Sequence, residues 1–224
     1  MPRHYIHGGA ADFIVSQCLD LSTIIENDGV MPPVLFRDFK SLTAWKNQHD
    51  MAIQRVGNRR LTSVVRIRGY YRCLNSGLNT LLPYDQLWAR ASYRSYASAM
   101  KELSQSGFNI AGSDMIGVHA DHVINRARLL HLPHTWVKLF PVEATSNAPF
   151  GNIERRLPAI VFVDDQIRLS PILFLKLYCG RIPIDVNDLA ATLADIRGRL
   201  LTANAHIATL LHDMERDALR FLPA

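Results

Sequence analysis

Residues 118–129 read VHADHVINRARL, and residues 135–151 read TWVKLFPVEATSNAPFG. A turn-rich stretch at residues 112–117 precedes the first segment, and residues 135–142 alternate and are rich in strand formers. Ser146 and Asn147 are typical helix-capping residues, so a short helix can start at residues 147–156. The pattern predicts a small unit of strand, strand and helix at the centre of the chain.

The polar residues of this unit suit phosphodiester hydrolysis. That reaction needs a base to activate water and a cation to neutralise charge on the phosphate. A neutral histidine is a natural base near neutral pH, and Mg²⁺ or Mn²⁺ prefers oxygen ligands from Asp, Asn and phosphate. Adjacent residues of a regular strand point to opposite faces, so Asp121 and His122 can serve one site only at a strand end or a bulge.

The central segment resembles the HNH, or His-Me finger, nuclease motif over residues 119–151. Asp121-His122-Val123 is similar to the motif's first strand, and residues 136–139 are similar to its second. Asn147 and Gly151, four residues apart, are similar to its helix start. The resemblance implies that His122 is the catalytic base and that Asp121 and Asn147 hold one Mg²⁺ or Mn²⁺ ion. It also implies that His119 supports these residues without binding the metal itself.

The segment also departs from the family pattern. The CxxC pairs that bracket the motif in many members are absent, and Ala148, Pro149 and Phe150 replace the basic residue that often lies between the motif's Asn and Gly. The expected short helix carries Glu154, Arg155 and Arg156, which either contact phosphate or form a solvated face.

Residues 55–72 form a basic run, because no acidic residue occurs between Asp50 and Asp85. Arginine binds phosphate with a planar fork, and tyrosine offers a face for base stacking. The run predicts a nucleic-acid surface; the alternative is a solvated helix face whose arginines pair with acids elsewhere. The residues expected to bind nucleic acid are Arg55, Arg59, Arg60, Arg66, Arg68, Tyr70, Tyr71 and Arg72, together with Arg155 and Arg156.

Apolar spacing predicts helices on both sides of the centre. The clearest helix is expected at residues 84–104, with further helices at residues 11–27, 37–54 and 171–179. A long helix is expected over residues 186–221, because its apolar positions repeat at strict 3,4 spacing from Val186 to Met214. Such a seam must pack on another helix, either of the same chain or of a second copy in a homodimer.

Composition adds little about function but excludes several classes. The formal net charge is +5, which is weak evidence for an anionic partner. Three scattered cysteines, with no CxxC, argue against a disulfide framework or a structural zinc site. The chain shows no signal peptide and no apolar stretch long enough to span a membrane, so we expect a cytoplasmic protein without a membrane partner.

Together these patterns predict an α+β fold that is mainly helical, with a small central ββα-metal-like unit and a long C-terminal helix. The expected regions are a helical part at 1–110, an HNH-like centre at 111–165 and a helical part at 166–224. The expected function is that of a metal-dependent HNH-like endonuclease acting on DNA or RNA, in a setting such as a bacterial toxin, effector or defence protein. The alternatives are a non-catalytic nucleic-acid-binding protein and a helical assembly protein that uses residues 186–214.

Overall fold

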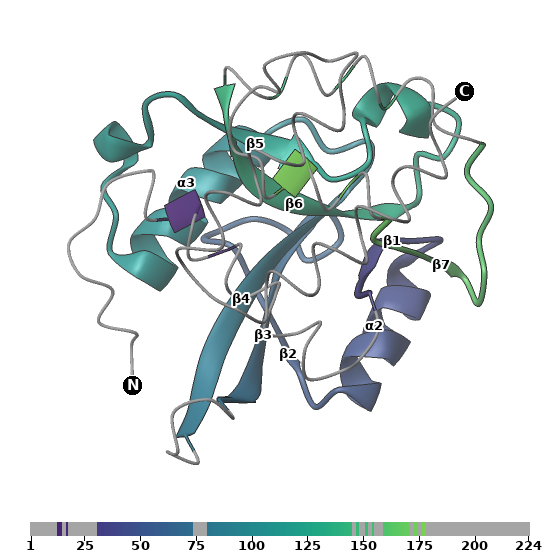
Figure 1. Cartoon of the computed structure of the whole chain (residues 1–224), viewed down its shortest axis with the longest axis horizontal. Coiled ribbons are helices and arrows are strands. Elements are labelled where there is room, and N and C mark those ends of the chain that lie inside the picture. The colour runs from purple at the N-terminus through teal and green to yellow at the C-terminus, as the bar shows by residue number, and fades with distance from the viewer. Residues whose placement is uncertain are drawn as a thin grey trace, which may run out of the picture.

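The computed structural model describes residues 31–73, 80–144 and 159–170, together with residues 13, 14, 17, 147, 151, 154, 173, 176 and 177. Its main element is a seven-stranded sheet (Figure 1). The strands are β1 (Pro33–Phe36), β2 (Ala52–Gln54), β3 (Val64–Cys73), β4 (Thr80–Arg90), β5 (Val118–His122), β6 (Trp136–Glu143) and β7 (Gln166–Arg168). The helices are α2 (Phe39–Gln48) and α3 (Tyr96–Phe108), with the 3₁₀ turns η1 (Gly112–Met115) and η2 (Arg126–Leu129).

Every pairing in the sheet is antiparallel, and the strand order is β2-β3-β4-β6-β1-β7. Strand β6 is central, because its first half pairs with β4 and β1 and its second half pairs with β5. The outer strands of this order, β2 and β7, have three residues each. Hairpin β3–β4 is long and extends away from the rest of the molecule (Figure 1).

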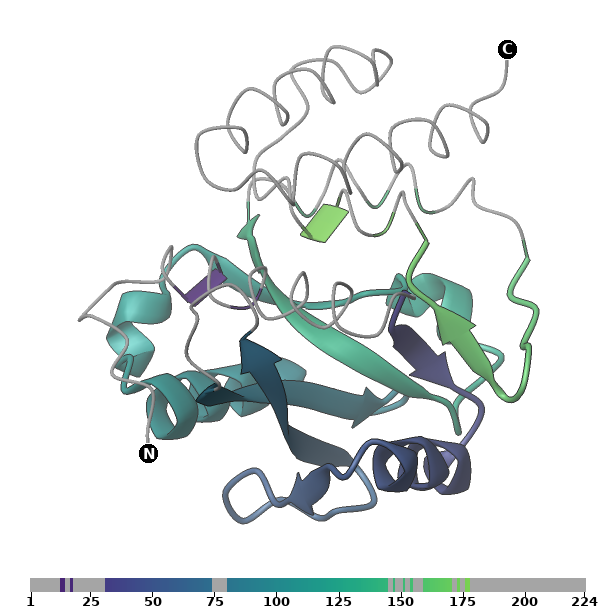
Figure 2. The same ribbon diagram turned by 60° about the horizontal axis from the view of Figure 1, so that its bottom comes forward.

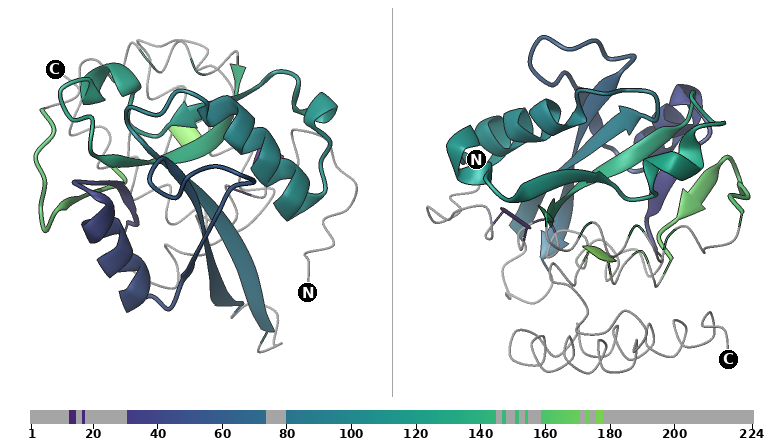
Figure 3. Two further views of the ribbon diagram at one scale, coloured as in Figure 1. Left: turned by 180° about the vertical axis from the view of Figure 1, so that it is seen from behind. Right: turned by 90° about the horizontal axis from the view of Figure 1, so that it is seen from above.

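Both faces of the sheet are covered. Val64, Leu87 and Ala89 pack in one core cluster with residues of α3, whereas Val65, Ile67 and Trp88 pack in another with Leu42 and Trp45 of α2. Since neighbouring strand residues point to opposite faces, α3 and α2 lie on opposite faces of the sheet. Figure 3 shows α3 against one face of the sheet, and Figure 2 shows α2 beside β1.

The prediction of a mainly helical fold is wrong, because a curled antiparallel sheet dominates the described residues. The clearest error concerns residues 84–104, where the expected single helix is the second half of β4 followed by α3. Leu87, Trp88 and Ala89 are all buried, which suits a strand that is covered on both faces as well as a helix. The apolar spacing therefore did not distinguish the two structures.

The other expected helices have different outcomes. Within residues 37–54, α2 is real but shorter; Asp38 caps it by accepting a hydrogen bond from the Ser41 amide (2.8 Å), and Asp50 follows its end at a φ of 52°. The basic run lies partly on strand β3 rather than on a helix. Residues 13, 14 and 17 and residues 173, 176 and 177 are helical, whereas the expected helix at 186–221 lies outside the described residues.

Candidate functional site

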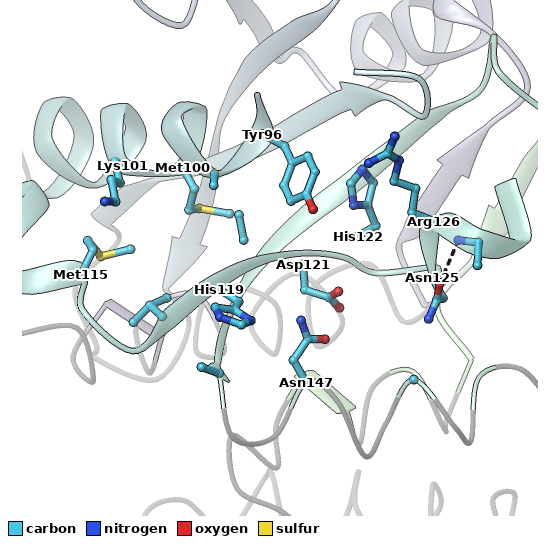
Figure 4. A pocket seen from close by; sticks show the side chains of 16 residues that line it. Tyr96, Met100, Lys101, Met115, His119, Asp121, His122, Asn125, Arg126 and Asn147 are labelled. Atoms are coloured by element: carbon cyan, nitrogen blue, oxygen red, sulfur yellow. Dashed lines mark hydrogen bonds between the residues drawn. The ribbon is translucent and has the colours of Figure 1, made fainter. Parts of the chain in front are cut away.

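A pocket of about 640 Å³ lies between α3 and the β5–β6 hairpin (Figure 4). Strand β5 supplies part of its wall, and Tyr96, Met100 and Lys101 of α3 face it from the other side. Five residues of the central motif line this pocket, and these are His119, Asp121, His122, Asn147 and Gly151. The chain therefore brings the two halves of the motif, which are separated by strand β6, to one cavity.

Asp121 and Asn147 meet at the pocket. Asp121 lies one residue before the end of β5, and Asn147 is a helical residue that follows β6. The Asn147 side chain lies against the Asp121 carboxylate and acts to lower its pKa, and Figure 4 shows the two side chains pointing toward each other. Burial raises the pKa of Asp121 above its usual value, although hydrogen bonds and Lys176 offset part of that effect.

His122 occupies the opposite side of β5 from Asp121, as strand alternation requires (Figure 4). The residue is 3% exposed, and the Tyr96 ring meets its imidazole edge-on at a centroid distance of 4.5 Å. Burial, with smaller contributions from Arg126 and Lys176, lowers the pKa of His122 to about 4. The Nε2 atom has no hydrogen-bond partner among the described residues, which is uncommon for a buried polar atom.

Two further ionisable residues, Glu154 and Lys176, belong to the site. The Lys176 ammonium, 1% exposed, pairs with the Asp121 carboxylate and donates a hydrogen bond to Glu154 Oε1 at 2.7 Å. It also donates to the main-chain oxygen of His122 at 3.3 Å. Burial raises the pKa of Glu154, and the Lys176 charge opposes that rise.

Sequence reasoning missed Lys176 altogether and placed Glu154 on a solvated or phosphate-contacting face. A signal for Lys176 was present, because it is the one charged residue in the apolar stretch PILFLKLY at residues 171–178. A lysine at the centre of such a stretch has to find an acidic partner when the stretch is buried. The identity of that partner depended on the fold.

The arginines of the basic run are in two different situations. Arg66 and Arg68 both bind the Asp85 carboxylate through two hydrogen bonds each, at 2.7 to 3.0 Å. Arg59 donates to the Ser98 hydroxyl, whereas Arg55 and Arg60 are exposed. None of these five arginines is among the residues that line the pocket.

Of the remaining residues expected to bind nucleic acid, the structure describes the side chain of Tyr70 alone. Tyr70 on β3 is 60% exposed, which leaves its ring accessible for stacking. The side chains of Tyr71 and Arg72, and the whole of Arg155 and Arg156, lie outside the described part of the chain.

A metal cage made of protein side chains is absent from the described residues, since no three His, Cys, Asp or Glu side chains gather closely enough to form one. Asp121 and Asn147 nevertheless supply a carboxylate and an amide oxygen side by side. Magnesium often uses one or two protein oxygens and fills the remaining positions with water and phosphate. The two residues therefore fit a hard divalent ion that is held partly by its substrate.

Comparison of the chain with models of known protein families, with curated proteins and with solved structures found no match. In the described part of the chain, no helix combines the length and apolar character needed to cross a membrane.

Proposed function

We propose that this protein is a metal-dependent endonuclease that resembles the HNH type and hydrolyses phosphodiester bonds of DNA or RNA. The observation that carries the proposal is the gathering of His119, Asp121, His122 and Asn147 at one pocket. These residues come from two segments separated by β6, and the same residues belong to the HNH-like sequence motif. Their order, two paired strands followed by helical residues, agrees with the motif's order.

His122 suits the role of base. Its lowered pKa keeps the imidazole neutral at neutral pH, so Nε2 can accept a proton from an attacking water. Burial and the contact with Tyr96 hold the ring in one orientation. Nε2 has no hydrogen-bond partner in the described structure and is buried, so water has to gain access to this atom before it can act as a base.

Asp121 and Asn147 suit the role of metal ligands. A bound Mg²⁺ or Mn²⁺ ion would stabilise charge on the phosphate and the leaving oxygen. Asp121 would provide the charged ligand, and the Asn147 amide would orient that carboxylate and add a second oxygen. Lys101 and Arg126 also line the pocket, and their positive charges favour an anionic substrate there.

The experiment compares His122→Ala with the wild type in cleavage of plasmid DNA and of structured RNA, each with Mg²⁺ or Mn²⁺. Loss of a general base costs about 10²–10⁴ in rate, so we expect the variant to lose cleavage by that factor. His131→Ala is the matched control, because His131 is an exposed histidine and does not line the pocket. It should cleave at the wild-type rate.

Two results would overturn the proposal. The first is a wild-type protein that cleaves neither nucleic acid with either metal, and the second is a His122→Ala variant that remains active. Binding without cleavage would instead support the non-catalytic nucleic-acid-binding alternative. The assembly alternative depends on residues 186–214, which lie outside the described structure.

A further inference from the structure

The cluster formed by Lys176, Asp121 and Glu154 has an uneven charge. Two carboxylates share one ammonium, and the exposed fractions of the three side chains are 1% for Lys176, 13% for Asp121 and 2% for Glu154. When all three groups are ionised, one negative charge is left over in a place that water hardly reaches. Uncompensated charge in such a setting is costly, so the cluster favours a further cation, which is either a proton or a metal ion.

The position of Lys176 determines where such a cation can bind. Its ammonium takes the Oδ2 atom of Asp121 and the Oε1 atom of Glu154. The Oδ1 atom of Asp121 is not part of that ion pair, and Asp121 borders the pocket, whereas Glu154 and Lys176 do not line it. A cation that enters from the pocket therefore reaches the cluster through Asp121.

We propose that Lys176 sets the affinity of the pocket for a divalent ion. Its ammonium neutralises one of the two carboxylates and competes with the divalent ion for Asp121. This inference rests on the proposed metal site at Asp121 and Asn147. Glu154 acts in the opposite direction, because it draws the ammonium away from Asp121 and restores negative charge to the cluster. Lys176 is thus a positioning residue that acts through Asp121 and does not itself contact the divalent ion.

The proposal predicts an order of affinities that follows charge. Glu154→Gln leaves one carboxylate and one ammonium, so the cluster becomes neutral and Mn²⁺ should bind roughly tenfold more weakly. The double variant Glu154→Gln, Lys176→Met keeps the wild-type net charge but frees Asp121 from the ammonium, so Mn²⁺ should bind roughly tenfold more tightly than to the wild type. Lys176→Met alone should bind most tightly.

The experiment is calorimetric titration of the full chain with Mn²⁺ alone, in the absence of nucleic acid. Lys176→Met leaves two buried carboxylates without a counter-charge and can fail to fold, which is why the double variant is the decisive one. Asp165→Asn is the matched control for Glu154→Gln, because it also converts a carboxylate to an amide but at an exposed ion pair with Arg37. Its Mn²⁺ affinity should equal that of the wild type.

The inference is overturned if Glu154→Gln binds Mn²⁺ as the wild type does, if the double variant binds no more tightly than the wild type, or if neither the wild type nor the double variant binds Mn²⁺. Cleavage is measured separately, so the two proposals can fail independently. A protein that shows the predicted order of affinities but cleaves no nucleic acid would support the role of Lys176 and contradict the nuclease.

Discussion

Two ion clusters of this molecule are mirror images in composition. At hairpin β3–β4, Arg66 and Arg68 share the single carboxylate of Asp85. Next to the pocket, the single ammonium of Lys176 is shared by Asp121, which lines the pocket, and by Glu154, which does not. The first cluster carries one surplus positive charge, and the second carries one surplus negative charge.

The two clusters differ further in how completely their atoms are bonded. Four hydrogen bonds join the arginines to Asp85, and these bonds outweigh burial and hold the pKa of that carboxyl below its usual value. At the pocket, burial prevails and raises the pKa of both carboxyls, and the neighbouring Nε2 of His122 has no partner in the described structure. The bonding of the arginine cluster suits a role in stabilising the fold, whereas the lysine cluster, if the proposed metal site is correct, keeps bonding capacity for a ligand.

Breaking the arginine cluster should have the largest effect on stability. Asp85→Ala leaves the buried guanidinium of Arg66 without its counter-charge, so we expect the free energy of unfolding to fall by about 3–5 kcal/mol. Denaturant unfolding of the full chain measures this loss. Asp165→Ala removes an exposed partner of Arg37 and should change the same quantity by no more than about 1 kcal/mol. Equal losses of unfolding free energy in the two variants would show that the buried cluster contributes no more to stability than the exposed ion pair does.

The pH dependence of stability should reveal the cost of burying His122 at the pocket. Since the folded pKa of His122, about 4, lies below its unfolded value of 6.5, the unfolded chain binds the proton more readily between these pH values. The wild type should therefore lose about 3 kcal/mol relative to His122→Phe as the pH falls from 7 to 4. Parallel unfolding measurements on the two proteins test this, because other titrating groups are common to both. Parallel pH curves would show that His122 is as easily protonated in the folded protein as in the unfolded chain.

The smallest effect is expected for the exposed arginines, which resemble neither cluster. Arg55 and Arg60 are exposed, whereas Arg66 and Arg68 are held by Asp85. If the basic run binds nucleic acid, replacing Arg55 and Arg60 with Gln should make the negative slope of log affinity against log salt shallower. The change should be roughly 0.7–0.9 for each phosphate that the protein no longer neutralises. Arg68→Gln should change that slope less, because Arg68 is bound to Asp85. A change larger than that for Arg55 and Arg60 would show that the ion pair with Asp85 does not prevent Arg68 from binding phosphate.

The sequence was informative where the pattern was local. Alternation over residues 135–142 predicted strand β6, and the spacing of Asp121, His122, Asn147 and Gly151 predicted a group of residues that the structure does place at one pocket. The chemistry assigned to those residues stays a prediction. Strand alternation also anticipated that Asp121 and His122 face opposite ways and that a strand end is needed to bring both to one site.

The sequence misled where burial was two-sided. Strands β3 and β4 pack against helices on both faces, so Val64, Val65, Leu87 and Trp88 are all buried and the period of two is lost. The arginine run was ambiguous for a related reason, because the acid that binds two of its members lies 17 residues or more further along the chain. Lys176 was missed because its partners come from β5 and from a helical residue at 154, and such long-range pairs depend on the fold.

The short outer strands of the sheet also affect how the protein behaves at high concentration. Unpaired backbone groups along the edge of a sheet are where chains join into aggregates. Here β2 and β7, at the two ends of the strand order, offer three residues each, and β7 follows Asp164 and Asp165, both at positive φ. A second copy that tried to extend the sheet from β2 or from β7 would therefore find only three residues of strand to pair with at each of them.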